Sequence, residues 1–304
     1  MITGEQATTA ARIGDLTLAC PRCRAPLVPD GDSAVRCTVE GDRFPNEDGI
    51  WCFLLPERER RLAQFMAEYA AVRRAEGRGD DDPSFYRALP FHDLTGRFVD
   101  DWRIRAVSYQ ALVNRVLPPL ETRWRRPLRI LDLGAGNCWL SYRLARRGHS
   151  VVAVDLLTDL RDGLGAYAHY DAVFTPVQAE FDRLPFADGQ ADLAIFNASL
   201  HYSPDYATTL REVLRVLAPE GQVVILDSPV YRDARSGEQM LREREAEFTR
   251  RFGFPSNSLP SEGYLTVGRL DSLAAALGLR WHTHEPWYGW QWALRPWKAR
   301  LRGR

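Results

Sequence analysis

The feature that most constrains the fold is a strand, a glycine turn, a helix and a second strand that follow one another in the middle of the chain. Arg129–Leu133 is a short apolar strand, and the turn Gly134–Asn137 comes directly after it. Trp139–Arg147 has the apolar spacing of a helix, and the β-branched strand Ser150–Val154 then leads into Asp155. Two strands joined by a crossing helix pair in parallel within one sheet. The pattern therefore predicts an α/β fold with a mostly parallel sheet of the Rossmann-like type.

Length and charge limit the partners that the chain can have. Its 304 residues, 45% of them hydrophobic, suit about two globular domains. The 40 basic and 40 acidic residues give no net charge, which disfavours wholesale wrapping of nucleic acid.

No run of about 18 apolar residues is present, so no membrane span is expected. Residues 1–15 lack the pattern of a signal peptide. We therefore expect a cytoplasmic protein whose cysteines are reduced thiols or metal ligands.

Glycine turns of this kind serve sites for NAD, FAD and S-adenosylmethionine (SAM), and three features favour SAM. A dinucleotide site has a third glycine at the position of Trp139, where an indole leaves little room for a pyrophosphate. Asp132, just before the turn, suits an ammonium group better than a phosphate. The stretch Val177–Phe186, after a third strand at about 172–177, is the third feature. In addition, Asp155 can hold both hydroxyls of a ribose.

The ordered motifs over residues 126–228 resemble the class I SAM-dependent methyltransferases. Asp192–Asn197 matches the fourth strand of that family, and Ala198–Tyr202 matches the loop that follows it. The amphipathic run at 205–217 matches the next helix. The resemblance implies SAM as the cofactor and methyl transfer as the reaction.

The same resemblance implies how the rest of the core is organised. A methyltransferase core is expected over residues 126–304, with an inserted segment at about 229–262. The segments Leu279–Glu285 and Gly289–Leu294 are expected to supply a final antiparallel pair of strands. The fold class that follows is α/β, with a Rossmann-like, seven-stranded and mostly parallel sheet.

The resemblance also implies roles for single residues. Asp132 is expected near the amine of SAM, and Asp155 at the ribose. Glu180 and the backbone of Phe181 are expected to contact the adenine. The full cofactor-binding set implied in this way is Asp132, Gly134, Ala135, Gly136, Asp155, Leu156, Glu180, Phe181 and Asn197.

Four of the five cysteines lie near the N-terminus. Cys20 and Cys23 form a CxxC pair, and Cys37 follows. Thiolates spaced in this way converge on one tetrahedral zinc ion. A second CxxC would need a cysteine where Glu40 stands, so the fourth ligand is expected to be Glu40 or Cys52. The alternatives are a metal-free relic of the same fold and a redox pair, for which the preceding thioredoxin-like strand is missing.

The N-terminal module, residues 1–55, has a second mark of a small ribbon. The segment Cys20–Leu55, with the phrase Phe44–Ile50 inside it, resembles the zinc-ribbon module of the Trm112-like type, which often precedes methyltransferase domains. The resemblance implies a structural zinc ion. The ribbon carries more Asp and Glu than Arg, so it suits a structural or protein-docking role better than an RNA clamp.

Residues 56–125 are predicted to form a helical lid or linker between the ribbon and the core. Apolar residues recur at helical spacing over 57–76 and again over 98–116. Pro118 and Pro119 are expected to end the second helix. The aromatic residues of this region either pack in the core or, around 84–90, cover the pocket of the next domain.

Direct displacement of a methyl group needs alignment, exclusion of water and sometimes a base. His201 is the candidate base because the loop after the fourth strand opens toward the methyl group, and Tyr202 is the second candidate. Local packing of His201 is the alternative. The candidates for contact with substrate are Tyr86, Arg87, Asp227 and Tyr231.

Three hypotheses for the function remain open. The first is methylation of a small-molecule acceptor, favoured by the neutral charge and by tryptophans such as Trp281 and Trp287. The second is methylation of a base in ribosomal or transfer RNA, because the order of ribbon, helices and core resembles the rRNA guanine-N1 methyltransferases. The third is a non-catalytic SAM-binding adaptor that docks a protein through its ribbon. The basic tail Lys298–Arg304 is interpreted as solvated, with weak nucleic-acid or lipid contact as the alternative.

Overall fold

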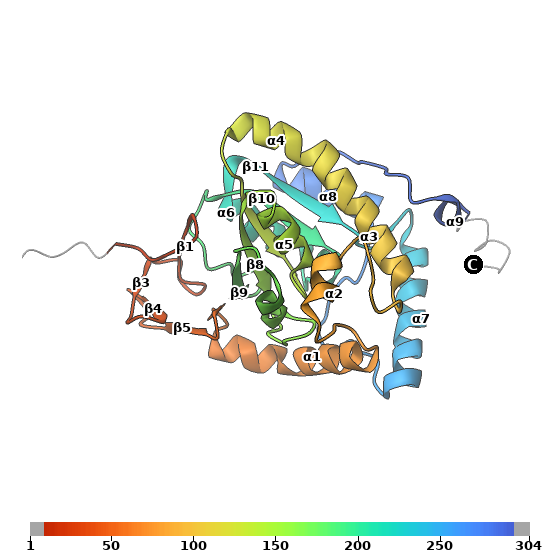
Figure 1. The fold of residues 1–304 in the computed structure, drawn as a ribbon, viewed down its shortest axis with the longest axis horizontal. Helices are drawn as coiled ribbons and strands as arrows, with labels where there is room; N and C mark the ends of the chain where they lie inside the picture. Colours follow the sequence, from red (N-terminus) through yellow and green to blue (C-terminus); the bar gives the residue numbers. More distant parts are fainter. Residues whose placement is uncertain (1–8, 295–304) are drawn as a thin grey trace, which may run out of the picture.

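The structure is a computed structural model that describes residues 9–294, and the basic tail Lys298–Arg304 lies outside that range. A nine-stranded sheet crosses the molecule in the order β11-β10-β7-β8-β9-β6-β5-β4-β3 (Figure 1). Its first five strands are parallel to one another. They are β11 (Leu217–Leu226), β10 (Ala191–Asn197), β7 (Arg129–Leu133), β8 (Ser150–Asp155) and β9 (Thr175–Gln178). The predicted α/β fold with a Rossmann-like, mostly parallel sheet is confirmed.

The strands at the far edges differ from the prediction. The segment at 279–289 has no regular structure, and α9 (Trp290–Ala293) is a short helix, so neither predicted C-terminal strand forms. Most side chains from His282 to Glu285 are exposed, and a strand there would have no apolar face to bury. The antiparallel strands of the sheet come instead from the N-terminal module.

The N-terminal module is built into the main sheet. Its strands β3 (Leu27–Pro29), β4 (Ala34–Cys37), β5 (Arg43–Glu47) and β6 (Ile50–Cys52) pair antiparallel in sequence order. A separate pair, β1 (Arg12–Ile13) and β2 (Leu16–Thr17), lies beside them. Strand β6 pairs in parallel with β9 of the core, with Trp51 opposite Val177. The module is therefore a continuation of the sheet, and its chain leads straight into helix α1 (Pro56–Ala75).

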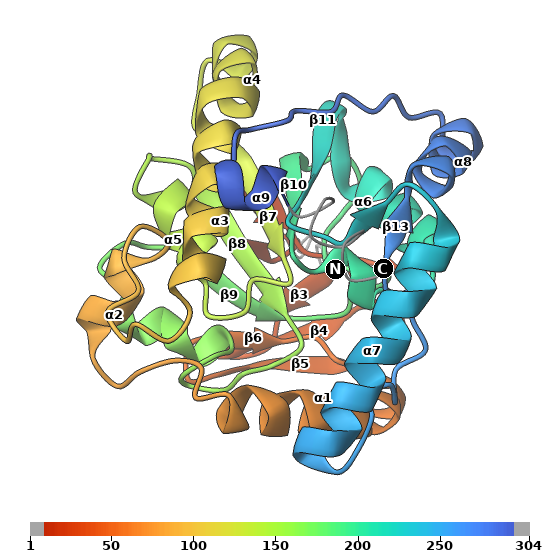
Figure 2. The ribbon, with the colours of Figure 1, turned by 90° about the vertical axis from the view of Figure 1, so that its right-hand side faces the viewer.

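Two apolar cores lie on opposite faces of the sheet because successive side chains of a strand alternate. Ile130 of β7 belongs to the core that contains α2 (Pro83–Ala88), α3 (Val99–Ala111) and α5 (Trp139–Ala145). Leu131 belongs to the core that contains α6 (Tyr206–Val216) and α8 (Val267–Leu277). Figure 2 shows α3 and α5 on one side of the strands and α6 and α8 on the other.

The helical region matches the prediction at its start and departs from it at its end. The run predicted over 57–76 is α1, but Pro118 and Pro119 do not end the second helix. They open α4 (Leu117–Trp124), which continues α3 through the π-helical turn η1 (Leu112–Val116), and Figure 1 shows one long rod. Proline has no N–H to donate, so it fits at the start of a helix.

The remaining elements lie around the carboxyl ends of the parallel strands or in the inserted segment. The short helices η2 (Leu164–His169) and η3 (Leu200–Tyr202) follow β8 and β10. The insertion forms β12 (Val230–Tyr231) and α7 (Ala234–Phe252), and β12 pairs in parallel with β13 (Leu265–Thr266). Among the described residues, none of the helices combines the length and apolar character that crossing a membrane requires.

Candidate functional site

The glycine turn after β7 is held against the neighbouring strand β8. The backbone N–H groups of Gly134 and Ala135 both donate to the carbonyl of Val154, at 2.7 and 3.0 Å. Gly134 has φ +77°, and a Cβ atom there would lie 2.3 Å from the Cβ of Ser199. Gly136 has φ +53°, but a Cβ there would meet no atom within 4 Å. Gly134 is therefore needed for packing, whereas Gly136 turns its Cα toward open space where a ligand can approach.

Asp155, at the end of β8, ties the turn to its own strand. Its Oδ2 accepts a hydrogen bond from the backbone N–H of Gly136 at 2.8 Å, and its Oδ1 accepts one from Leu157 at 2.9 Å. Burial raises the pKa of this carboxyl above its usual value. The acid and the glycine turn, from two different strands, are thus brought to one point at the carboxyl edge of the sheet.

Two adjoining cavities open at this edge. One, of about 200 Å³, has a wall of apolar side chains from α1 and is called the apolar cavity. The other, of about 240 Å³, is lined mainly by charged and polar groups and is called the polar cavity. They share Tyr69, Gly134, Gly136, Asp162, Ala198 and Tyr202. This is where a parallel α/β sheet binds its ligands, beyond the carboxyl ends of the strands.

The apolar cavity is lined by six of the predicted cofactor residues. Beside Gly134 and Gly136 of the shared wall they are Asp155, Leu156, Glu180 and Phe181. Leu62, Phe65 and Tyr69 of α1 form the facing wall, and Leu259 of the inserted segment adds to the lining. The sequence indicated that the α1 side chains face inward but gave no sign of which surface they cover.

The polar cavity holds the remaining predicted residues and several buried atoms without a partner. Asp132, Ala135, Asn197 and His201 all line it. Within the part of the chain that the structure describes, Asp132 Oδ1, Asn197 Oδ1, His201 Nδ1 and Trp102 Nε1 are buried and lack a hydrogen bond. Buried polar atoms are nearly always satisfied, so a group of four around one cavity indicates a polar ligand.

Asp132 is the most strongly perturbed acid of the site. It is completely buried, and its Oδ2 accepts a hydrogen bond from the hydroxyl of Ser141 at 2.7 Å. Burial raises the pKa of Asp132 to about 7, because a desolvated carboxylate has too little compensating charge around it. The other oxygen, Oδ1, is the unpartnered atom that faces a prospective ligand.

Glu180 has a partner that the sequence did not reveal. Arg58 of α1 binds its carboxylate with two nitrogens, Nη2 at 2.6 Å and Nε at 2.9 Å from the two oxygens. Both side chains are largely buried. The predicted contact of Glu180 with an adenine amino group therefore has to share this carboxylate with a guanidinium. Arg58 is distant in sequence, and no motif marks it.

Of the candidate catalytic residues, His201 is buried and lines the polar cavity, and Tyr202 lines both cavities. Burial lowers the pKa of His201 to about 4, and the nearby Arg244 and Arg105 add to this effect, so the imidazole is neutral at ordinary pH. The ring of Tyr202 contacts that of His201 at 4.3 Å and packs edge-on against Tyr69 at 5.6 Å. A neutral imidazole with an open Nδ1 can accept a hydrogen bond from a ligand.

The four residues predicted to contact substrate do not line either cavity. Tyr86 is fully buried, its hydroxyl bonds to the backbone of Asp80 and Arg161, and its ring stacks on His169. Its aromatic ring is used for packing, which is the alternative interpretation of that segment. Arg87 donates to the carbonyl of His169 at 2.9 Å on the outer side of α2.

Asp227 and Tyr231 follow β11 and line neither cavity. Asp227 accepts a hydrogen bond from the hydroxyl of Ser108 at 2.5 Å. Tyr231 packs edge-on against Tyr264, with ring centroids 5.9 Å apart. The chain leaves the carboxyl end of β11 into the inserted segment, which carries these side chains away from the glycine turn.

Three of the predicted metal ligands converge in the N-terminal module. The sulfur atoms of Cys20, Cys23 and Cys37 lie within 4.8 Å of one another. Cys52 stands apart on β6, where its sulfur contacts the carbonyl of Ile50, and the group found among the described residues contains neither it nor Glu40.

The electrostatics of the cysteine cluster differ from one thiol to the next. Burial raises the pKa of Cys20 to about 12. Burial also raises the pKa of Cys37, but backbone N–H groups of Glu40 and Val39 point at its sulfur, at 3.3 and 3.5 Å, and the net pKa of this thiol is lowered. Amides directed at a sulfur stabilise a thiolate, the form that binds metal.

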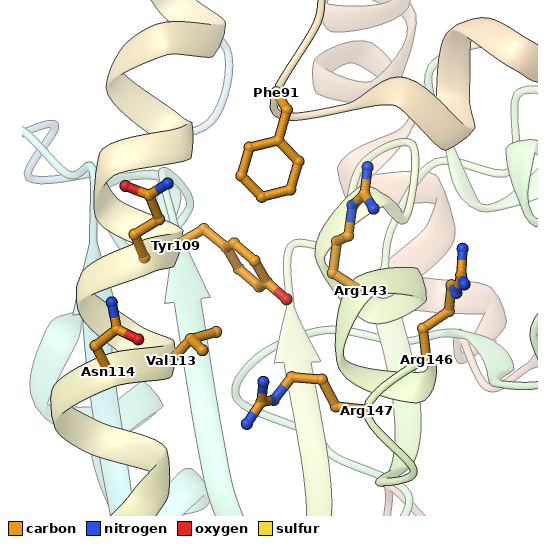
Figure 3. Close-up of a pocket in the computed structure, with 8 residues that line it drawn as sticks. Phe91, Tyr109, Val113, Asn114, Arg143, Arg146 and Arg147 are labelled. Atoms are coloured by element: carbon orange, nitrogen blue, oxygen red, sulfur yellow. The ribbon is translucent and has the colours of Figure 1, made fainter.

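A third cavity, of about 300 Å³, lies between α3 and α5 (Figure 3). Arg143, Arg146 and Arg147 face Phe91 and Tyr109 across it, and Figure 3 shows no acidic side chain among the labelled residues. These cations already have partners: Arg143 donates to the carbonyl of Leu89 at 2.7 Å, and the other two bond to Tyr142 and Glu121. None of the predicted site residues lines this cavity, so it is not the candidate site.

Comparison with known proteins gives the class of the core. Residues 131–225 match the family model of the methyltransferase domain. The chain is 36% identical over 121 residues to a malonyl-[acyl-carrier protein] O-methyltransferase of Halorhodospira halophila, covering 39% of this chain and 41% of that protein. It is 33% identical over 127 residues to a demethylmenaquinone methyltransferase of Mycobacterium marinum, covering 38% of this chain and 53% of that protein.

A solved structure from the same comparison is that of an arsenic(III) S-adenosylmethionine methyltransferase from Chlamydomonas reinhardtii. It is 28% identical, covers 50% of this chain and 52% of its own, and has a TM-score of 0.38. The chain thus spans about half or less of the lengths of these relatives. Residues 131–225 are therefore similar to methyltransferase domains.

The two glycines of the turn are expected to respond differently to an added methyl group. Gly136→Ala should lower the free energy of unfolding by about 1–2 kcal/mol, because an alanine is strained in the left-handed backbone conformation. Gly134→Ala should cost about 3 kcal/mol or more, because its Cβ also collides with Ser199. Urea denaturation measures both, and Gly134→Ala combined with Ser199→Gly should regain part of the loss. Equal losses in the two single variants would contradict the packing role given to Gly134.

Proposed function

We propose that this chain transfers a methyl group from SAM to a small-molecule acceptor. The observation that carries the proposal is the pair of adjoining cavities at the carboxyl edge of the sheet, with the buried, unpartnered Asp132 Oδ1 in one and Asp155 beside Gly136 in the other. The relatives whose names specify an acceptor support the small-molecule class, since they act on malonyl-[acyl-carrier protein] and demethylmenaquinone.

The residues present fit SAM. Gly136 leaves open space for a close approach of the ligand, and Asp155 is placed to accept from ribose hydroxyls with the lone pairs that its two backbone bonds leave free. The apolar wall of Leu62, Phe65 and Tyr69 suits the adenine ring. Asp132 offers its free oxygen to the ammonium group.

When bound, SAM supplies a methyl group on a positively charged sulfur: the lone pair of an acceptor atom attacks the methyl carbon, and the sulfur leaves as the thioether of S-adenosylhomocysteine. The protein's part is to align the two reactants and to keep water out. Tyr202 and Tyr69 pack against each other and line both cavities. His201 stays neutral and presents an unpartnered Nδ1, so it is placed to accept a hydrogen bond from an O–H or N–H of the acceptor.

We also propose that Cys20, Cys23 and Cys37 hold a structural zinc ion with a fourth ligand that none of the other described side chains supplies in this arrangement. The support is the convergence of three sulfur atoms within 4.8 Å and the amides directed at Cys37. A zinc ion would brace the module that carries β6 and leads into α1, and so would act on the site through the position of that helix.

The affinity for SAM is expected to rise with pH between 5.5 and 7.5. Asp132 has a pKa of about 7 without ligand, and a neighbouring ammonium group favours its ionised form. Binding therefore lowers this pKa and releases a proton, and the dissociation constant should fall by up to about tenfold per pH unit below 7. Isothermal titration calorimetry across this range, in buffers of different ionisation enthalpy, measures both effects.

Asp132→Asn should bind SAM more weakly and lose this pH dependence, because its side chain does not titrate. Asp188→Asn, a change of the same chemistry at an exposed site, is the matched control and should behave like the natural chain. A wild-type affinity that does not vary with pH, or an equal slope in Asp132→Asn, would remove Asp132 from the cofactor site.

Protein purified from zinc-supplemented culture should contain about one equivalent of zinc by elemental analysis, and a chelator should lower its melting temperature. Cys23→Ser should lose the metal because one of three converging thiolates is gone. Cys52→Ser is the matched control and should keep it, since this sulfur lies outside the cluster. A zinc content of less than about a tenth of an equivalent in the natural chain would contradict the zinc proposal.

A further inference from the structure

Among the described residues that line the polar cavity, one acidic oxygen and one guanidinium form neither a hydrogen bond nor an ion pair. Asp132 Oδ1 is the acidic oxygen, as described above. The guanidinium belongs to Arg105 of α3, which lines the same cavity. Among the described residues, Arg105 forms no hydrogen bond and no ion pair, and its guanidinium carbon lies over the ring of Trp102, 5.0 Å from the ring centre.

The other two cations of the cavity are already neutralised. Arg73 forms a two-nitrogen ion pair with Asp162, in which Nη2 and Oδ1 are 3.0 Å apart. Arg78 donates to both Glu76 and Asp101, each at 3.2 Å. The free positive charge in the cavity is therefore that of Arg105.

Asp227 acts on Arg105 through space but does not pair with it. The Asp227 carboxylate accepts its short hydrogen bond from Ser108, and no nitrogen of Arg105 comes within ion-pair distance of it. Burial lowers the pKa of Arg105, which reflects the cost of holding a charge away from water. Arg105 is only partly exposed, and a partly desolvated cation is stabilised once an anion binds beside it.

We infer that Arg105 binds the carboxylate of an α-amino acid group whose ammonium lies at Asp132, and that this group is the methionyl end of SAM. An α-amino acid group carries one ammonium and one carboxylate. The free oxygen of Asp132 can accept from the ammonium, and the guanidinium of Arg105 can donate to the carboxylate. The polar cavity joins the apolar cavity at Gly134 and Gly136, so a ligand with its adenosine in one extends into the other. The inference rests on the proposed function, because it assumes that SAM is the ligand.

The test compares two ligands that share the adenosine thioether. S-adenosylhomocysteine has the amino acid group, whereas 5′-methylthioadenosine lacks it. The natural chain should bind S-adenosylhomocysteine more tightly by calorimetry. Arg105→Gln should weaken S-adenosylhomocysteine about 10- to 100-fold, the effect of losing a charge-assisted hydrogen bond, and leave 5′-methylthioadenosine unchanged. Arg105→Lys should recover part of the loss.

Arg103→Gln is the matched control, since Arg103 lies on the same helix with a largely exposed side chain, and it should change neither affinity. Unchanged binding of 5′-methylthioadenosine also shows that Arg105→Gln is folded. If Arg105→Gln keeps full affinity for S-adenosylhomocysteine, as it would if Arg105 held an anionic acceptor instead, the inference is overturned while the proposed function stands. If it weakens both ligands equally, Arg105 has only a structural role and the inference is overturned as well. Failure of the natural chain to bind either ligand would refute the proposed function itself.

Discussion

The hydrogen bonds between the glycine turn and strand β8 are the constraint on which the site depends. Val154 receives two backbone N–H groups from the turn, and Asp155 receives a third from Gly136. These bonds fix the turn to the next strand, so that the ends of β7 and β8 form a single surface. Without them the open space at Gly136 and the acid at Asp155 would not lie side by side, and the two cavities would lose the glycine part of their common wall.

Helix α1 completes the site from the other side, and the N-terminal module determines where that helix starts. Arg58, Tyr69 and Arg73 reach across to Glu180, Tyr202 and Asp162 respectively. These contacts span three loops of the core, and most of their charged groups are shielded from water, so truncating one partner would leave the other buried and unpaired. The module therefore determines where α1 begins, because it continues the sheet through β6 and leads directly into that helix.

The sequence predicted what is encoded locally. Strands β7 to β10, the glycine turn and the acids Asp132 and Asp155 lie in segments where hydrophobic periodicity, glycine spacing and strand ends are enough to predict their positions. It also predicted that α1 has an inward face. It could not predict the pairing of Arg58 with Glu180 or the free charge of Arg105, because both depend on how distant segments pack and no local pattern marks them.

The errors have the same origin. Tyr86 is aromatic and precedes the core, but whether such a ring covers a ligand or packs beneath a helix depends on tertiary contacts, here a stack on His169. The strands expected after residue 279 do not form because sheet pairing needs an apolar face to bury. Among the described strands β11 ends the sheet on one side, and the N-terminal module extends it beyond β9 on the other. The prediction that Pro118 ends a helix is wrong, because a π-helical turn precedes it and Pro118 stands in the first turn of the next helical segment.

A crystal structure of the chain with S-adenosylhomocysteine tests the central claim most directly. The account predicts the ribose beside Asp155, the adenine against Leu62 and Phe65, and the amino acid group in the polar cavity with Asp132. Density for the ligand outside both cavities, or a turn whose amides hold a diphosphate while S-adenosylhomocysteine stays unbound, would contradict it.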